Sequence, residues 1–238
     1  MVPISVVIPV FRDEAALART IDSTDFNGCE LIMASTPDDR GPLALLRARR
    51  PDILWLETRR GRGHQMNAGA DVARGDWIVF LHADTLLAPR WRDAVEAADR
   101  DPCAAFGCFR FKLESPLLVA RAIEAGVRAR VRLLALPYGD QALFIRRRLF
   151  QALGGYADIP LMEDVDLVRR LRSHGTLFRS RLPALTSARK WEQDGWIRRT
   201  ARNLMLLARY FAGTSPERLH HLYNNDHAHQ TPGRHPQL

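Results

Sequence analysis

Residues 77–85 read Trp-Ile-Val-Phe-Leu-His-Ala-Asp-Thr, an apolar run that ends at a carboxylate. A continuous apolar segment rich in β-forming side chains is typical of a strand buried on both faces. Asp84 would then lie just past the carboxyl end of that strand, where open α/β sheets bind ligands. An acid in that place suits Mg²⁺ or Mn²⁺, which prefer oxygen ligands. The alternative is that Asp84 caps the following helix.

The composition is that of an ordinary globular domain, with 238 residues of which 46% are hydrophobic and 26% charged. A net charge of +8 indicates anionic partners. Nucleic acid is not predicted, because no recognition motif accompanies the charge. The three cysteines lack metal-site spacing, and no signal peptide or membrane span is expected. These features predict a reducing, cytoplasmic location.

Strand and helix patterns alternate through the first hundred residues, which predicts an α/β fold with a mainly parallel central sheet flanked by helices. Past residue 102 the pattern becomes more helical, with a long helix at 116–136 and further helices at 163–174 and 195–212. We expect one domain over residues 1–215, with a helical C-terminal part, followed by a flexible tail at 216–238. The expected strands cover 4–10, 30–34, 53–57, the apolar run that starts at 77 and ends just before Asp84, 104–113 and 141–146. The earlier helices are expected at 14–23, 42–49, 64–74 and 89–99.

Three further segments carry polar side chains suited to chemistry. Glycines and arginines at 59–63 precede a helix and make a plausible anion site, although Met66 breaks the dinucleotide fingerprint. The turn at 137–141 either shapes an acceptor pocket or is only a turn. At 163–166, Glu163 and Asp166 stand where acids favour the helix dipole, but neighbouring carboxylates such as Glu163 and Asp164 also raise each other's pKa, which suits a general base.

Taken in order, these segments resemble glycosyltransferase family 2, and especially its small bacterial branch of radical-SAM/selenodomain-associated transferases. The resemblance spans roughly residues 3–213. Each motif is weak alone, but their order and spacing are specific. The matching segments are Ile8-Pro9-Val10, Gln65-Met66-Asn67-Ala68-Gly69, Phe80 to Thr85, Gly139-Asp140-Gln141, Gly154-Gly155-Tyr156, Met162-Glu163-Asp164, Thr186 to Trp191, and Asn203.

The resemblance implies a GT-A fold and inverting transfer of a sugar from a nucleotide-diphosphate sugar to an acceptor hydroxyl, assisted by Mg²⁺ or Mn²⁺. Residues 1–101 would be the nucleotide-binding half and 102–215 the acceptor half. Asp164, beside Glu163, would be the base, and Asp84 would hold the metal. The residues implied at the nucleotide sugar are Pro9, Val10, Glu14, Arg62, Gln65, Asn67 and Asp84. Those implied at the acceptor or diphosphate are Asp140, Gln141, Arg189 and Trp191.

Two departures from the family pattern affect the donor site. Residues 33–36 read Met-Ala-Ser-Thr where relatives carry an acid that contacts the nucleoside, which leaves the nucleotide base open. His82 stands at the first acid of the Asp-x-Asp motif, so one carboxylate remains. His82 could coordinate a softer divalent ion, contact ribose, or be a buried structural histidine.

The helix expected at 116–136 has an apolar arc opposite several arginines. Such a helix either packs on the core with a solvated arginine face or lies on an anionic membrane and presents a lipid-linked acceptor. The latter would make the protein a peripheral protein at the inner face of the membrane. Two other functions stay open: a sugar-nucleotide pyrophosphorylase, although residues 9–14 lack its glycine-rich, lysine-containing loop, and an inert nucleotide-sugar-binding protein.

Overall fold

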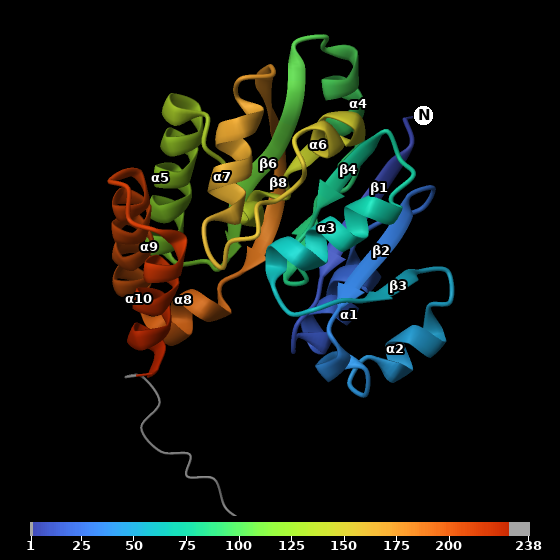
Figure 1. Ribbon diagram of the computed structural model, residues 1–238, viewed down its shortest axis with the longest axis horizontal. Helices are drawn as coiled ribbons and strands as arrows, with labels where there is room; N and C mark the ends of the chain where they lie inside the picture. Colours follow the sequence, from blue (N-terminus) through green and yellow to red (C-terminus); the bar gives the residue numbers. More distant parts are fainter. Residues whose placement is uncertain (1, 229–238) are drawn as a thin grey trace, which may run out of the picture.

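The computed structural model describes residues 2–228 of the chain, with side chains as far as residue 224. Within that range, eight strands form one sheet in the order β3-β2-β1-β4-β7-β6-β8-β5 (Figure 1). The expected α/β fold is present. The strands are β1 (Ile4–Pro9), β2 (Glu30–Ser35), β3 (Leu54–Glu57), β4 (Trp77–Phe80), β5 (Thr85–Leu87), β6 (Ala104–Glu114), β7 (Phe144–Arg146) and β8 (Thr176–Ser187).

Helices cover both faces of this sheet, with α3, α6 and α7 in front in the view of Figure 1 and α1 behind. The helices α5, α9 and α10 stand together at the left of that view. The helical elements are α1 (Glu14–Ser23), η1 (Pro37–Asp39), α2 (Ala44–Arg49), α3 (Arg62–Val72), α4 (Arg92–Arg100), α5 (Leu118–Leu134), η2 (Gly139–Gln141), α6 (Arg147–Ala152), α7 (Glu163–Leu171), α8 (Arg189–Asp194), α9 (Trp196–Phe211) and α10 (Pro216–Ala228).

The side chains of the central strand β4 alternate between two cores, one on each face of the sheet. Val79 belongs to the core that α1, α2 and α4 complete, whereas Ile78 and Phe80 belong to the core that α3, α5, α6, α7 and α9 complete. All three are fully buried or nearly so. Burying such a side chain contributes about 1.5–3 kcal/mol. A strand covered on both faces cannot alternate with polar residues, which explains the continuous apolar run.

The sheet is mixed rather than purely parallel, with parallel pairing predominant in its first half. Strands β3, β2, β1 and β4 run parallel, and β7 then pairs antiparallel with both β4 and β6. The long strand β8 pairs parallel with β6 and antiparallel with β5. Because β4 has a parallel neighbour on one side and an antiparallel one on the other, its carboxyl end opens beside connections from both halves of the chain.

Two segments differ from their expected structure. Strand β4 ends at Phe80, earlier than the expected end just before Asp84, because the amide of Thr85 bonds to the carbonyl of His82 in a turn before β5 begins. Residues 216–228, expected in the flexible tail, form helix α10, and its Leu219 is fully buried. Positions 229–238 of the expected tail lie outside the described residues. Among the described residues, no helix is long and apolar enough to cross a membrane.

Candidate functional site

Two hollows open side by side at the carboxyl ends of β1 and β4. The strand-end hollow is lined by Pro9, Phe11, Asp13, Gln65 and Ala83. The helix hollow is lined by residues from η2, α7, α8 and α9. Four side chains line both hollows and so form a partition between them. These partition residues are Arg62, His82, Asp84 and Lys190.

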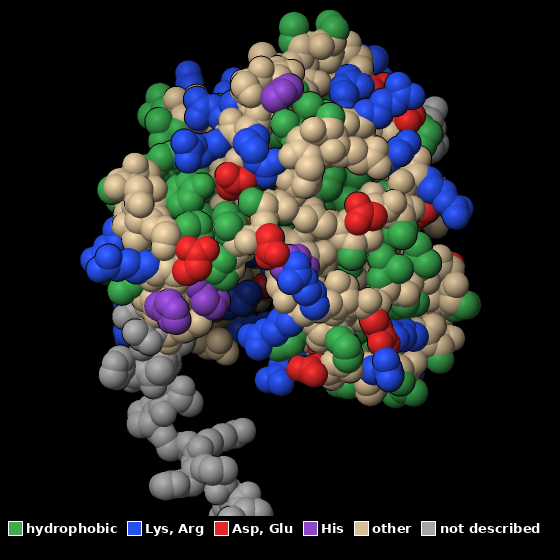
Figure 2. Space-filling view, in the orientation of Figure 1, with side chains coloured by type: hydrophobic (Ala, Val, Ile, Leu, Met, Phe, Trp, Pro, Cys, Tyr) green, Lys and Arg blue, Asp and Glu red, His purple; other side chains and the backbone are tan. Residues whose placement is uncertain are grey.

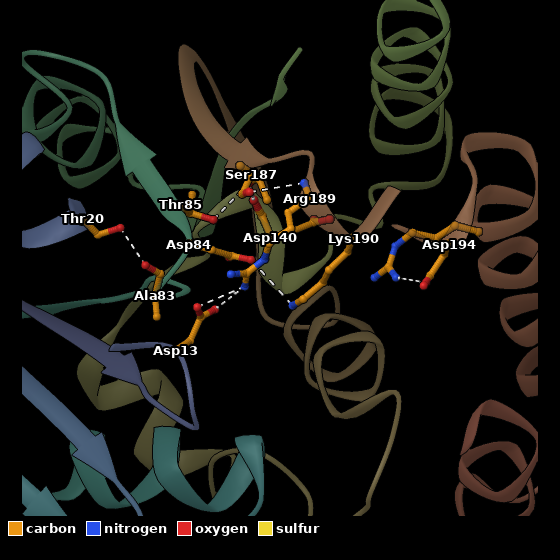
Figure 3. A network of polar contacts seen from close by, with 12 residues as sticks. Asp13, Thr20, Ala83, Asp84, Thr85, Asp140, Ser187, Arg189, Lys190 and Asp194 are labelled. Carbon is orange, nitrogen blue, oxygen red and sulfur yellow. Dashed lines mark hydrogen bonds and ion pairs between the residues drawn. The ribbon is translucent and has the colours of Figure 1, made fainter. Parts of the chain in front are cut away.

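Asp84 is held in the partition by its backbone. Its carbonyl accepts a 3.0 Å hydrogen bond from the amide of Ser187 at the end of β8, and the hydroxyls of Thr85 and Thr186 lie 3.1 Å apart beside it. The carboxylate faces Lys190, with Oδ2 3.6 Å from Nζ (Figure 3). Helix α4 begins only at Arg92, so Asp84 does not cap it.

His82 carries a buried ring nitrogen, Nε2, for which the described residues provide no hydrogen-bond partner. Burial, followed by the nearby charge of Arg62, lowers the pKa of His82 to about 4, so the imidazole is neutral at pH 7. A methyl group added at Gly139 would lie 2.9 Å from Nε2. Only glycine lets η2 approach the imidazole this closely.

The two acids at the start of α7 have different partners. Glu163, 2% exposed, forms an ion pair and hydrogen bond with Arg62. Asp164 accepts a 2.8 Å hydrogen bond from the amide of Gly139 at Oδ2, and another from the amide of Val165 at Oδ1. Met162 precedes them with φ of 68°, in the left-handed region that costs a non-glycine residue about 1–2 kcal/mol. This turn directs Asp164 into the helix hollow.

Asp140 and Gln141, neighbours in η2, are used differently. Gln141 is buried. Its Nε2 donates a hydrogen bond to the carbonyl of Phe109, and its Oε1 accepts one from the backbone amide of Tyr138. Asp140 lines the helix hollow, and its buried Oδ1 has no partner among the described residues. Burial raises the pKa of Asp140 to about 6, helped by the negative charges of Asp164 and Asp84 and opposed by Arg130 and Arg62. It is therefore a carboxyl that titrates near neutrality.

Helix α8 supplies cations and an indole. Arg189 bonds both carboxylate oxygens of Asp13, at 3.1 and 3.0 Å, so Asp13 precedes α1 without capping it through its side chain (Figure 3). Lys190 pairs with Asp84, as described above. Trp191 is buried against the ring of Phe111, and its Nε1 has no hydrogen-bond partner in the described part of the chain.

Two residues expected at the nucleotide sugar, Gln65 and Asn67, make hydrogen bonds to the backbone. Gln65 donates through Nε2 to the carbonyls of Val10 and Ala34, at 2.7 and 2.8 Å, and so joins the ends of β1 and β2. Asn67 makes two 2.9 Å hydrogen bonds to the backbone of Tyr156. Glu14 begins α1 and lines neither hollow. Of the expected set, the strand-end hollow is lined by Pro9, Arg62, Gln65 and Asp84.

The sequence was then compared with known proteins. The model of the family described as glycosyl transferase family 2 matches residues 5–150, which include β1 to β7 and most of the partition. The chain belongs to glycosyl transferase family 2. No protein of curated function matches its sequence.

Solved structures of S. aureus TarS share the family 2 fold. TarS 1–349 superposes with a TM-score of 0.59 at 12% sequence identity, covering 81% of this chain and 62% of TarS. Crystals of the same TarS fragment with UDP and with UDP-GlcNAc match with the same TM-score and identity, covering 78% of this chain and 60% or 58% of TarS. The chain thus spans about three fifths of the TarS 1–349 fragment, and the match establishes a GT-A type fold.

Two residues that matter in this family 2 chain escaped the sequence analysis. Lys190 lies in the motif at 186–191, but only the pairing of β5 with β8 places it opposite Asp84. Asp39 is fully buried in η1, accepting hydrogen bonds from the amide of Arg12 and from Thr36. It ties the loops after β1 and β2 together. Its signal was the Thr-Pro-Asp-Asp sequence just after β2, which forms a capping box.

The partition fits a magnesium or manganese ion only if a substrate supplies further ligands. No group of three His, Cys, Asp or Glu side chains in the described residues is arranged to hold a metal. Mg²⁺, however, is commonly bound by one or two carboxylates together with substrate phosphates and water. Asp84 offers such a carboxylate, whose present partner is the 3.6 Å contact with Lys190. The metal expected at Asp84 and His82 stays a prediction.

Proposed function

We propose that this protein is an inverting glycosyltransferase that moves a sugar from a nucleotide-diphosphate sugar to an acceptor hydroxyl. Family membership supports the reaction class. The observation that carries the proposal is a set of four buried polar atoms on residues that line the helix hollow, none with a hydrogen-bond partner among the described residues: His82 Nε2, Asp140 Oδ1, Trp191 Nε1 and Arg199 Nε. Buried polar atoms are normally satisfied, so four beside one hollow point to a polar ligand that completes them.

The partition suits the diphosphate of the donor. Arg62 and Lys190 place two positive charges between the hollows, where a diphosphate would connect a nucleoside on one side to a sugar on the other. The nucleoside would occupy the strand-end hollow, beside the ring of Phe11. The UDP and UDP-GlcNAc complexes of TarS support a uridine nucleotide as the first donor to test.

Asp164 is the proposed base. Its carboxylate faces the helix hollow and is held by two backbone amides, whereas Glu163 is committed to Arg62. In the proposed step, the acceptor oxygen bonds to the anomeric carbon and its proton passes to Asp164. The bond from that carbon to the diphosphate oxygen breaks, and nucleoside diphosphate leaves with the electron pair.

We further propose that Asp84 holds a divalent cation when the donor is bound. A metal ion there would supply charge neutralisation of the diphosphate leaving group. The protein's own contribution is the cationic pair Arg62 and Lys190, which acts on the same charge. Asp84→Asn should therefore lose stimulation by Mn²⁺ or Mg²⁺ while keeping the basal rate that these two cations support.

The experiment is to incubate the protein with nucleotide-diphosphate sugars and metal, without and with candidate acceptors, and to measure released nucleoside diphosphate. Asp164→Asn should abolish acceptor-dependent transfer and leave donor binding intact in a thermal-shift assay. The matched control is Asp166→Asn, two residues along α7, where the carboxylate pairs with Arg170 outside both hollows. Full transfer by Asp164→Asn would refute the base assignment.

The same incubation separates the other two functions. Formation of nucleoside triphosphate with added pyrophosphate would favour a pyrophosphorylase. Donor binding with no turnover for any acceptor or metal would favour an inert nucleotide-sugar-binding protein. Slow hydrolysis of the donor, with water as acceptor, is the expected minimal activity of the transferase.

A further inference from the structure

An apolar groove runs between α5 and α9 and opens into the helix hollow. Its walls carry almost only apolar side chains from the two helices and from β6 and α8. Four residues line both the groove and the helix hollow: Tyr138, Asp140, Trp191 and Asn203.

The groove is left apolar and open by the way α5 packs. Among α5 side chains only Ala120 and Val131 are buried, while Ile123 and Val127 are partly buried against the cluster of Phe111 and Trp191. The expected apolar arc of this helix therefore packs on the core only in part. At the rim of the groove, Ile197 is 81% and Leu204 56% exposed, so two large apolar side chains of α9 lie together at a surface that solvent reaches.

A basic hollow adjoins the groove on the other side of α5. It shares Phe111 and Val127 with the groove and is lined by five exposed arginines. None of the five forms an ion pair with a described carboxylate, and the glutamate in the same hollow is paired with Arg121 instead. These unpaired arginines are Arg110, Arg128, Arg132, Arg179 and Arg181. Figure 2 shows hydrophobic and basic side chains side by side over this part of the surface.

We propose that the groove holds the hydrocarbon chain of a membrane-anchored acceptor, whose hydroxyl-bearing head enters the helix hollow at Asp140, while the basic hollow rests on anionic lipid headgroups. The proposal rests on the glycosyltransferase function above and names its acceptor class. Two observations support the proposal: the groove is continuous with the helix hollow, and the five arginines of the adjacent basic hollow have no described carboxylate partner. The remaining segment of the chain, 229–238, has Leu238 as its only large aliphatic or aromatic residue and is a poor match for the groove.

Gly126 offers a substitution that fills the groove without disturbing the fold. It lies within α5, lines the groove, and a methyl group added there would meet no atom within 4 Å. Gly126→Phe also replaces a poor helix former with a better one. The matched control is Ala125→Phe, one residue away, at an exposed position that lines neither the groove nor the basic hollow.

The first test uses tryptophan fluorescence, because Trp191 and Trp196 line the groove. We expect saturable quenching by 12-bromododecan-1-ol and none at equal concentration by 3-bromopropan-1-ol. The apparent affinity should fall at least tenfold in Gly126→Phe and remain within twofold of the parent in Ala125→Phe. Equal quenching in all three proteins would overturn the groove as the chain site.

The second test is sedimentation with vesicles of phosphatidylcholine, with and without phosphatidylglycerol. Binding should require the anionic lipid and fall severalfold in the double variant Arg128→Gln, Arg132→Gln. Quenching without vesicle binding would overturn the membrane source in favour of a free apolar acceptor. Donor hydrolysis reports on the proposed function separately. If donor hydrolysis is absent, the proposed transferase function is refuted whatever the groove binds. If donor hydrolysis is present but the bromoalcohol does not quench, only the groove proposal is refuted.

Discussion

Replacing Asp140 with asparagine should stabilise the fold at pH 8 and have no effect at pH 4. Its Oδ1 is buried without a hydrogen-bond partner among the described residues, and burial raises the pKa of the carboxyl to about 6 from the ordinary 3.8. An ionised carboxylate in this position has lost water without gaining a hydrogen bond, which makes the charged form costly. Asparagine keeps the size of the side chain and removes the charge.

The size and sign of the effect follow from proton linkage. Between pH 3.8 and about 6 the folded protein holds a proton at Asp140 that the unfolded chain has released, so stability falls as the pH rises through this window. The pKa of Asp140 is 3.8 in the unfolded chain and about 6 in the folded protein. Since each pKa unit is worth about 1.4 kcal/mol, the fully ionised group lowers the free energy of unfolding by about 3 kcal/mol. That cost is complete above pH 6 and is absent below 3.8.

Urea denaturation at pH 4 and pH 8 measures the difference directly. We expect Asp140→Asn to exceed the parent in unfolding free energy by about 1–3 kcal/mol at pH 8, allowing for partial solvent access, and to match it at pH 4. The control is Asp71→Asn on the exposed face of α3, where the substitution removes a carboxylate that is not buried. A pH-independent change, or destabilisation at pH 8, would refute the interpretation that the ionised carboxylate of Asp140 lowers the stability of the fold.

Three further substitutions test the geometry of the site. Gly139→Ala should lower kcat/KM for transfer at least tenfold with little loss of stability, because the added methyl group would lie 2.9 Å from a ring nitrogen; Gly41→Ala, where nothing lies within 4 Å, should change neither quantity. Glu163→Gln should raise the KM for the donor and cost about 1–3 kcal/mol in a denaturant titration, since its arginine partner loses a buried carboxylate. Lys190→Met should strengthen Mn²⁺ binding to the donor-free protein severalfold by electron paramagnetic resonance, because the ammonium competes for Asp84; unchanged affinity would count against a metal there.

Sequence patterns predicted the elements whose burial is local and strong. Helix α1 has the expected bounds, and the apolar runs of β1, β2 and β4 are strands because both faces of the sheet are covered. Strand β8 was missed because Arg179, Arg181 and Pro183 interrupt its apolar pattern. Its stability comes from pairing with β6 and β5, contacts between residues far apart in the sequence that no local pattern reports.

The same distinction applies to the site. Motif order was enough to bring Asp84, Asp140, Asp164 and Trp191 to one hollow. It did not separate ligand-facing groups from those that hold the backbone, such as Gln65 between the ends of β1 and β2. That difference depends on where a side chain points after packing. Position along the sequence does not determine it.

The four partition residues imply that the two hollows cannot fill independently. Any ligand that moves Lys190 away from Asp84 in the strand-end hollow also changes the charge and shape of the helix hollow. If donor binding changes the affinity for acceptor by some factor, acceptor must change the affinity for donor by the same factor. The shared wall thus couples the affinities for the two substrates through its ion pairs, and substitutions in it should change both affinities together.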